Sequence, residues 1–160
     1  MAVRNAYVLS ETVKTQVNGG GVIAIAGNFE TLVADDAGSK YRLCKVGASW
    51  VPLKIEINND SIAGATDMDL GLYETLENGG AVKDADVFMD GTDINAGSAI
   101  GSEVSGLSNI DIDSIGEQMY QYAGETTLEP ARMYDLVLTA NSDITGAGTI
   151  AFRMWFAKTT

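Results

Sequence analysis

The sequence contains no histidine and only one cysteine, Cys44. Without histidine the chain lacks the commonest general base, every Ser-His or Cys-His nucleophile pair and the commonest metal ligand. A single cysteine cannot form a disulfide within the chain, which excludes a disulfide-built scaffold and favours folding in a reducing cytosol. Cys44 is interpreted as a small buried hydrophobic residue of a strand. We expect no enzyme, no cofactor and no metal site.

Long apolar runs are also missing. The longest purely aliphatic run covers residues 22–26, which is far too short to span a bilayer. The first ten residues lack the apolar core of a signal peptide. We therefore expect neither membrane embedding nor secretion by such a signal. The 160 residues favour one domain.

Positive charge is scarce, because ten basic residues stand against 22 acidic ones and the net charge is −12. Residues 55–129 carry −15, whereas residues 1–54 carry +2 and residues 130–160 carry +1. The acidic middle would repel a phosphate backbone, so nucleic acid is not an expected partner. The nearly neutral ends are better candidates for contacts with another protein.

The acidic residues leave two other kinds of site open. Pairs such as Asp67/Asp69 and Asp111/Asp113 would suit a two-carboxylate glycoside hydrolase, although 22 acids produce close pairs without any function. The stretch 84–93 is an acidic loop with oxygen ligands of the kind that calcium prefers, but its spacing is not that of an EF-hand. Its four acids are Asp84, Asp86, Asp90 and Asp93.

Alternating apolar residues and abundant glycine, with 18 glycines and only two prolines, indicate many short strands. The expected strands cover residues 22–26, 29–34, 40–46, 50–57, 67–74, 100–112, 133–140 and 149–157. In 50–57 the alternation places Val51, Leu53, Ile55 and Ile57 on one face, and Pro52 indicates an edge position or a bulge.

Two stretches between the strands have a different character. Residues 76–93 are expected as a long acidic loop in which 87–89 dock as an anchor. Residues 114–124 form the only expected helix, with Ser114 and Glu117 at the spacing of a capping box. The whole pattern predicts an all-β fold, an antiparallel β-sandwich of jelly-roll type with one short helix.

The chain divides into an extended N-terminal arm, 1–21, and a sandwich domain, 22–160. The arm has no hydrophobic period and ends in three glycines, so it has little reason to pack on its own domain. Such a segment can add to a partner's sheet edge or lie in a groove. Its candidate contact residues are Val3, Arg4, Tyr7, Val8 and Leu9.

The strand at 149–157 is apolar on both faces, which is expected of a strand that a partner covers. Trp155 and Arg153, on the face opposite Phe152 and Phe156, are therefore the candidates for self-association into a dimer or trimer. Exposed aromatic residues would also suit a carbohydrate- or receptor-binding module, which stays open as an alternative function.

Three stretches, 34–43, 67–73 running into 78–82, and 134–141, together resemble small virion proteins that tailed bacteriophages, especially short-tailed ones, encode beside the major capsid protein. They read ADDAGSKYRL, DMDLGLY with NGGAV, and YDLVLTAN. The resemblance covers roughly residues 30–157 and identifies no functional residue. It implies a capsid cement (decoration) protein with a jelly-roll-like sandwich. Such a protein is made in the host cytoplasm, lies on the capsid exterior, and binds the major capsid protein.

Overall fold

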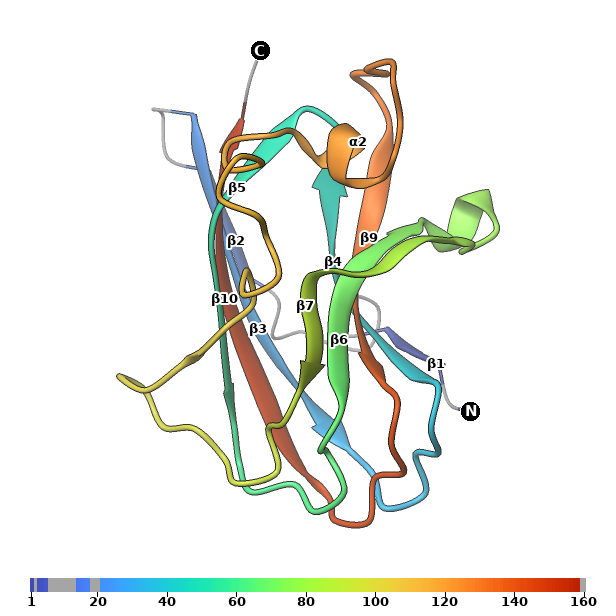
Figure 1. Cartoon of the computed structure of the whole chain (residues 1–160), viewed down its shortest axis with the longest axis vertical. Coiled ribbons are helices and arrows are strands. Elements are labelled where there is room, and N and C mark those ends of the chain that lie inside the picture. Colours follow the sequence, from blue (N-terminus) through green and yellow to red (C-terminus); the bar gives the residue numbers. More distant parts are fainter. Residues whose placement is uncertain (2, 6–13, 18–20, 159–160) are drawn as a thin grey trace.

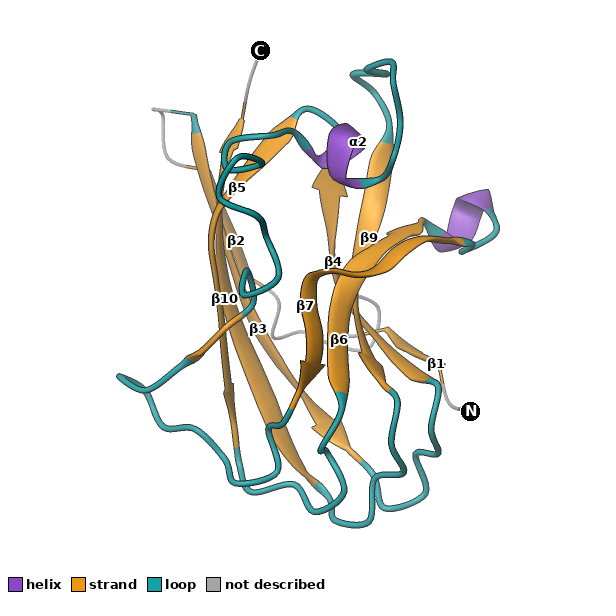
Figure 2. Ribbon diagram, viewed as in Figure 1, coloured by secondary structure: helices purple, strands orange, loops and turns teal. Residues whose placement is uncertain are grey.

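The computed structural model describes residues 1, 3–5, 14–17 and 21–158. Within them, strands form two five-stranded sheets that face each other (Figures 1 and 2). The strands are β1 (Val3–Asn5), β2 (Lys14–Val17), β3 (Val22–Thr31), β4 (Ser39–Gly47), β5 (Trp50–Asn59), β6 (Met68–Glu74), β7 (Val82–Thr92), β8 (Val104–Ser105), β9 (Met133–Ala140) and β10 (Gly148–Lys158). A 3-10 turn, η1 (Leu76–Asn78), and a short helix, α2 (Met119–Tyr122), lie in the connections. No helix of the described part is long and apolar enough to cross a membrane.

The strand order confirms the predicted jelly roll. One sheet, here the β9 sheet, has the order β1-β4-β9-β6-β7, and the other, the β10 sheet, has the order β2-β3-β10-β5-β8. Apart from β1 and β2, eight strands remain, and the last two, β9 and β10, insert beside early strands of each sheet. This interleaving is the arrangement of two Greek keys. All neighbouring strands are antiparallel except β1, which pairs with β4 in parallel.

The core lies between the sheets, as the alternation of the longest strands predicts. Ile150, Phe152, Met154 and Phe156 of β10 are at most 1% exposed. They face the equally buried inward residues of β9 and β6, which are Tyr134, Leu136, Leu138, Met68, Leu70 and Leu72. The burial of about ten large apolar side chains is the main stabilising contribution to this fold.

Strand β5 contains the bulge that Pro52 indicates. Trp155 pairs with Lys54 and Phe156 pairs with Pro52, so Leu53 is an extra residue in the ladder. The extra residue reverses the alternation, and Leu53 is 51% exposed while Ile55 is buried. The prediction that Leu53 and Ile55 share the inner face is therefore wrong, because a bulge shifts the side-chain period by one residue.

The stretch 76–93 is not a loop, which corrects the sequence prediction. It holds η1 and the eleven-residue strand β7, and within β7 Phe88 and Met89 are completely buried, as expected of an anchor. The alternation of β7 is hidden because its register with β6 shifts several times between Val82 and Thr92. At Gly71 of β6 a side chain would lie 2.1 Å from the Asp84 carbonyl oxygen, so only glycine permits β7 to cross β6 here.

The predicted helix 114–124 is correct only in its second half. Residues 114–118 are not helical, and Gly116 has a φ of 93°, a left-handed conformation that interrupts a right-handed helix. Glu117 does not close the predicted capping box with Ser114. Instead, the Gln118 N–H donates to Gln121 Oε1 over 2.9 Å at the start of α2. Of the predicted strand at 100–112, only Val104–Ser105 pairs with β5.

Candidate interaction surfaces

The N-terminal segment lies at one edge of the sandwich. Strand β1 pairs with β4 from Val3 opposite Lys40, and β2 pairs with β3 from Lys14 opposite Ala26. These pairings place the described parts of the arm beside its own domain. Among the five candidate contact residues, Val3 and Arg4 belong to β1, whereas Tyr7, Val8 and Leu9 lie outside the described residues. The contact of this segment with a partner stays a prediction.

Trp155, one candidate for self-association, lies on the outer face of the β10 sheet. It is half-buried and does not belong to the hydrophobic core. Its neighbours across the strands are Ala24 of β3 and Lys54 of β5, and the Lys54 ammonium is 5.8 Å from the centre of the indole ring. A partly exposed indole beside an alanine and a lysine is suited to contact with another protein.

Arg153, the second candidate, binds two carboxylates within its own chain. Its guanidinium is 2.9 Å from Glu56 Oε2 and 2.5 Å from Glu103 Oε1, and Glu56 also pairs with Lys54. The Gly101 N–H and Arg153 both hold the pKa of Glu103 below its ordinary value. The two cations and two anions around Arg153 therefore balance one another, on a protein whose net charge is −12. Self-association through this face stays a prediction.

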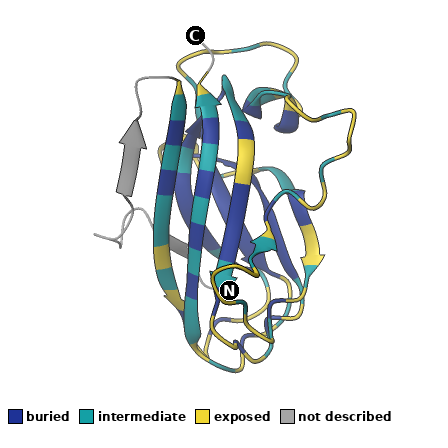
Figure 3. Cartoon of the chain, turned by 90° about the vertical axis from the view of Figure 1, so that its left-hand side faces the viewer, coloured by how far each residue is buried: buried dark blue, intermediate teal, exposed yellow. Residues whose placement is uncertain are grey.

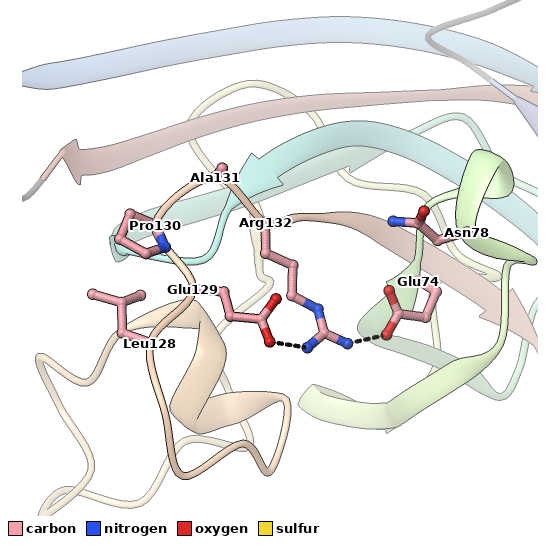
Figure 4. A pocket seen from close by; sticks show the side chains of 7 residues that line it. All are labelled: Glu74, Asn78, Leu128, Glu129, Pro130, Ala131 and Arg132. Atoms are coloured by element: carbon pink, nitrogen blue, oxygen red, sulfur yellow. Dashed lines mark hydrogen bonds and ion pairs between the residues drawn. The ribbon is translucent and has the colours of Figure 1, made fainter.

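A five-membered ion network occupies one end of the sandwich, beside an open hollow of about 740 Å³. Figure 4 shows this hollow with Glu74, Glu129 and Arg132 of the network. Lys83 of β7 is 3.1 Å from Glu74 and 2.7 Å from Glu125. Arg132 pairs with Glu74 as well and lies 3.4 Å from Glu125 and 3.8 Å from Glu129. The network joins the β6–β7 hairpin to the loop between α2 and β9.

The charges of this network are mutually satisfied. Burial would raise the pKa of Glu74, but hydrogen bonds from Arg132 and Lys83 outweigh burial and leave this pKa below its ordinary value. The Lys83 ammonium likewise lowers the pKa of Glu125, and the two carboxylates raise the pKa of Lys83. A carboxylate stabilised as an anion is a poor general acid. The hollow in Figure 4 is therefore walled by a structural cluster.

A buried ion pair on the outer face of the β9 sheet was missed by the sequence analysis. Arg42 of β4 pairs with Asp135 of β9, and the two side chains are 3% and 0% exposed. Arg42 also donates to the carbonyl oxygens of Glu74 (2.9 Å) and Gly80 (3.0 Å). The available signal was one basic and one acidic residue, each flanked by core residues in an alternating strand.

Of the acidic pairs considered for hydrolysis, one has structural partners and the other lies exposed. The Asn141 side-chain amide donates to both Asp67 (3.0 Å) and Asp69 (2.6 Å), and the Gly91 N–H also donates to Asp69. Asp111 and Asp113 lie exposed in a turn region. Within the described residues there is no group of three or more acidic or cysteine side chains placed to hold a metal ion.

Cys44 is buried, as interpreted from the sequence. Its Sγ lies 3.7 Å from the sulfur of Met154 in the core. Burial, and then the nearby charge of Asp135, raise the pKa of the Cys44 thiol well above its usual range. The thiol is therefore protonated and unreactive at neutral pH.

No protein-family model and no curated protein matches the sequence. Two solved structures share the fold. A chain of the capsid of Ralstonia phage GP4 superposes with a TM-score of 0.59 at 14% identity, over 99% of both chains. A chain of the cyanophage Pam1 capsid asymmetric unit gives a TM-score of 0.53 at 10% identity, over 90% of this chain and 91% of that chain. At these identities the comparison establishes the fold.

Proposed function

We propose that this protein is a structural component of a bacteriophage capsid and acts there as a cement protein on the outside of the assembled shell. The observation that carries the proposal is the end-to-end likeness to a chain of a phage capsid, in which 99% of both chains superpose. A jelly roll alone hosts many functions. A match of 90% or more of the chain to two capsid chains supports a virion role more specifically.

The mechanism is stabilisation by mass action. A protein that binds the assembled shell and not its free subunits lowers the free energy of the assembled state, and the effect grows with the logarithm of its free concentration relative to Kd. This role needs a rigid body and surfaces for protein partners. The interleaved sheets supply the rigid body. We assign the N-terminal segment, at one edge, to the contact with the major capsid protein. We assign the outer face around Trp155 to the contact with another copy of this protein.

The direct test is purification of intact particles of the encoding phage. We expect the protein to sediment with them at a fixed ratio to the major capsid protein, and to be accessible to protease or antibody on intact particles. Shells prepared without it should disassemble at a lower temperature, and adding the purified protein should restore their stability. Absence from purified particles would refute the proposal.

The role of the N-terminal segment is tested by deletion of residues 2–18. Because the core lies between the sheets, the truncated domain should still melt cooperatively. Attachment to shells should be lost if the segment is the capsid contact. A well-folded truncation that attaches as well as the full chain would move the contact to the sandwich body.

A carbohydrate- or receptor-binding module of a virion is the alternative function. Trp50, one of the two tryptophans, packs against the core with its ring centre 5.8 Å from that of Phe156, so it does not offer a free stacking face. Trp155 offers part of its ring on the outer face. Binding to a glycan array that Trp155→Ala abolishes, without any association with shells, would favour this alternative.

A further inference from the structure

One loop closes the edge of the sandwich that lies opposite the N-terminal segment. Strands β7 and β8 end the two sheets on this side, whereas β1 and β2 end them on the other. The Gly106 N–H donates to the Ile55 carbonyl of β5 over 2.9 Å, and the Asn109 N–H donates to the Phe88 carbonyl of β7 over 3.0 Å. The loop 106–118 therefore bridges the two sheets, as the path from β8 to α2 in Figure 1 shows.

On one side of this loop is a hollow of about 190 Å³, here called the apolar hollow. Its wall consists mainly of Pro52, Leu53, Leu107, Ile110, Ile115 and Tyr122. Leu53 is 51% exposed and Ile115 is 71% exposed, so two large aliphatic side chains at this hollow are open to solvent. The bulge in β5 and the left-handed Gly116 are the features that turn these two side chains outward. Such a concave apolar surface is typical of a protein contact.

The adjoining hollow, about 220 Å³ in volume, is acidic. It shares Ile110 and Tyr122 with the apolar hollow, and three carboxylates line it, those of Asp84, Asp86 and Asp111. The structure describes every residue that lines this hollow, and none of these residues is basic. Burial, and then a hydrogen bond with Asp86, raise the pKa of Asp84 above its ordinary value. A cation from a partner would offset the repulsion between the Asp84 and Asp86 carboxylates.

We propose that the two hollows together dock a segment of the shell protein in which an apolar side chain stands next to a lysine or arginine. The apolar side chain would enter the hollow beside Leu53 and Ile115. The basic side chain would face the carboxylates of the acidic hollow. This inference rests on the proposed capsid function and names the chemistry of one partner surface.

The position of the hollows is the reason to assign them to the shell rather than to a second copy. They lie at the edge opposite β1 and β2, four strand spacings or about 19 Å away across the sheet. With the N-terminal segment bound at one edge and the hollows at the other, a single molecule contacts two places on the shell and ties them together. A second copy, with its own charge of −12, would be repelled by the acidic hollow.

The test measures cosedimentation of the full chain with shells that lack it. Ile115→Ser removes an exposed apolar side chain, and we expect its affinity for shells to fall about tenfold or more. The double variant Asp86→Asn, Asp111→Asn removes two charges, and we expect its loss of affinity to be larger at about 0.05 M salt than at about 0.5 M salt, because salt screens the ion pairs.

Matched controls lie outside both hollows. Ile100→Ser removes an isoleucine that is 81% exposed in another loop, and Asp90→Asn removes an exposed charge from the same strand as Asp86. Both should bind shells like the unaltered protein, and none of the variants should melt at a lower temperature than it.

Three outcomes would overturn the assignment. If Ile115→Ser and the double variant bind shells as tightly as the controls, the hollows are not the docking site. If these variants instead change the sedimentation of the free protein in the absence of shells, the occupant is a second copy. If the unaltered protein does not bind shells at all, the proposed function fails, and the docking assignment fails with it.

Discussion

The outer faces of the two sheets have the same sequence pattern but opposite environments. On β9 the outward residues Asp135, Val137 and Thr139 are no more than 6% exposed. On β10 the outward Arg153 is 38% exposed and Trp155 is half-buried. Figure 3 views the molecule from the side of the β10 sheet, where buried and intermediate residues alternate along the strands.

The difference arises from segments outside the two strands. Strand β7 passes over β6 at Gly71, and the main chain at Glu74 and Gly80 provides acceptors for Arg42, so the β9 sheet buries charge on its outer face. The β10 sheet has small residues and satisfied surface ions there instead. An alternating pattern thus fixes which side chains share a face, while the cover over that face depends on distant parts of the chain.

The largest effect that separates the two faces is expected for Asp135→Asn. This variant keeps the shape of the side chain but leaves the Arg42 guanidinium buried without its counter-charge. Breaking a buried pair in this way costs about 3–5 kcal/mol of the free energy of unfolding. Urea denaturation monitored by tryptophan fluorescence would measure the loss. The comparison variant on the other face is Lys54→Gln, which removes an exposed ammonium from Glu56 but leaves Glu56 paired with Arg153, and it should cost less than about 1 kcal/mol. Equal losses for the two variants would show that the faces do not differ energetically.

The second-largest loss of stability is expected where β7 covers the outer face of β6. Gly71→Ala would place a Cβ 2.1 Å from the Asp84 carbonyl oxygen, so β7 must move away from β6. Such overpacking costs about 1–3 kcal/mol, and the movement should also increase amide hydrogen exchange in β7. Gly79→Ala is the matched control for crowding, because nothing lies within 4 Å of the corresponding position and only its left-handed φ adds strain. A Gly71→Ala protein with unchanged exchange in β7 would contradict the role of this glycine.

The sequence predicted the parts of the fold in which one face of a strand stays in the core. Strands β4, β9 and β10 agree closely with the predicted stretches, because the ladders of β4 with β9 and of β10 with β3 keep the two-residue period over most of their length. Pro52 also indicated the bulge correctly, although the sequence did not reveal that the extra residue is Leu53.

The features that the sequence did not predict depend on contacts between distant segments. Strand β7 looked like a loop because several register shifts against β6 destroy its alternation. The pairing of Arg42 with Asp135 requires knowledge that β4 lies beside β9. The two hollows at the far edge need the bulge at Leu53 and the turn at Gly116 together, and neither signal alone indicates a binding surface.

The third effect tests the exposed face. Trp155→Ala should lower the free energy of unfolding by less than about 1.5 kcal/mol, because the indole lies outside the core, whereas Phe156→Ala in the same strand should cost about 3–5 kcal/mol. If the β10 face joins two copies, Trp155→Ala should weaken self-association measured by analytical ultracentrifugation far more than it weakens folding. A large loss of stability without a change in association would assign Trp155 to folding alone.

The smallest effect is expected for two carboxylates, Asp84 and Glu125, whose pKa values shift in opposite directions on folding. The pKa of Asp84 is raised in the folded protein, mainly by burial, so its ionised form destabilises the fold above this pKa, and the penalty disappears as the pH falls below the unfolded value of about 3.9. Asp84→Asn should therefore raise the melting temperature slightly at pH 7 and have no such benefit near pH 3.

The pKa of Glu125 is lowered by Lys83, so its contribution to stability is present above the unfolded value of about 4.3 and is lost as the pH falls through the folded pKa. Glu125→Gln should accordingly lower the melting temperature slightly at pH 7 and less at pH 3. Thermal melts of both variants across this pH range would check the signs, and parallel pH profiles for the two would show that the acidic hollow exerts no repulsion on Asp84.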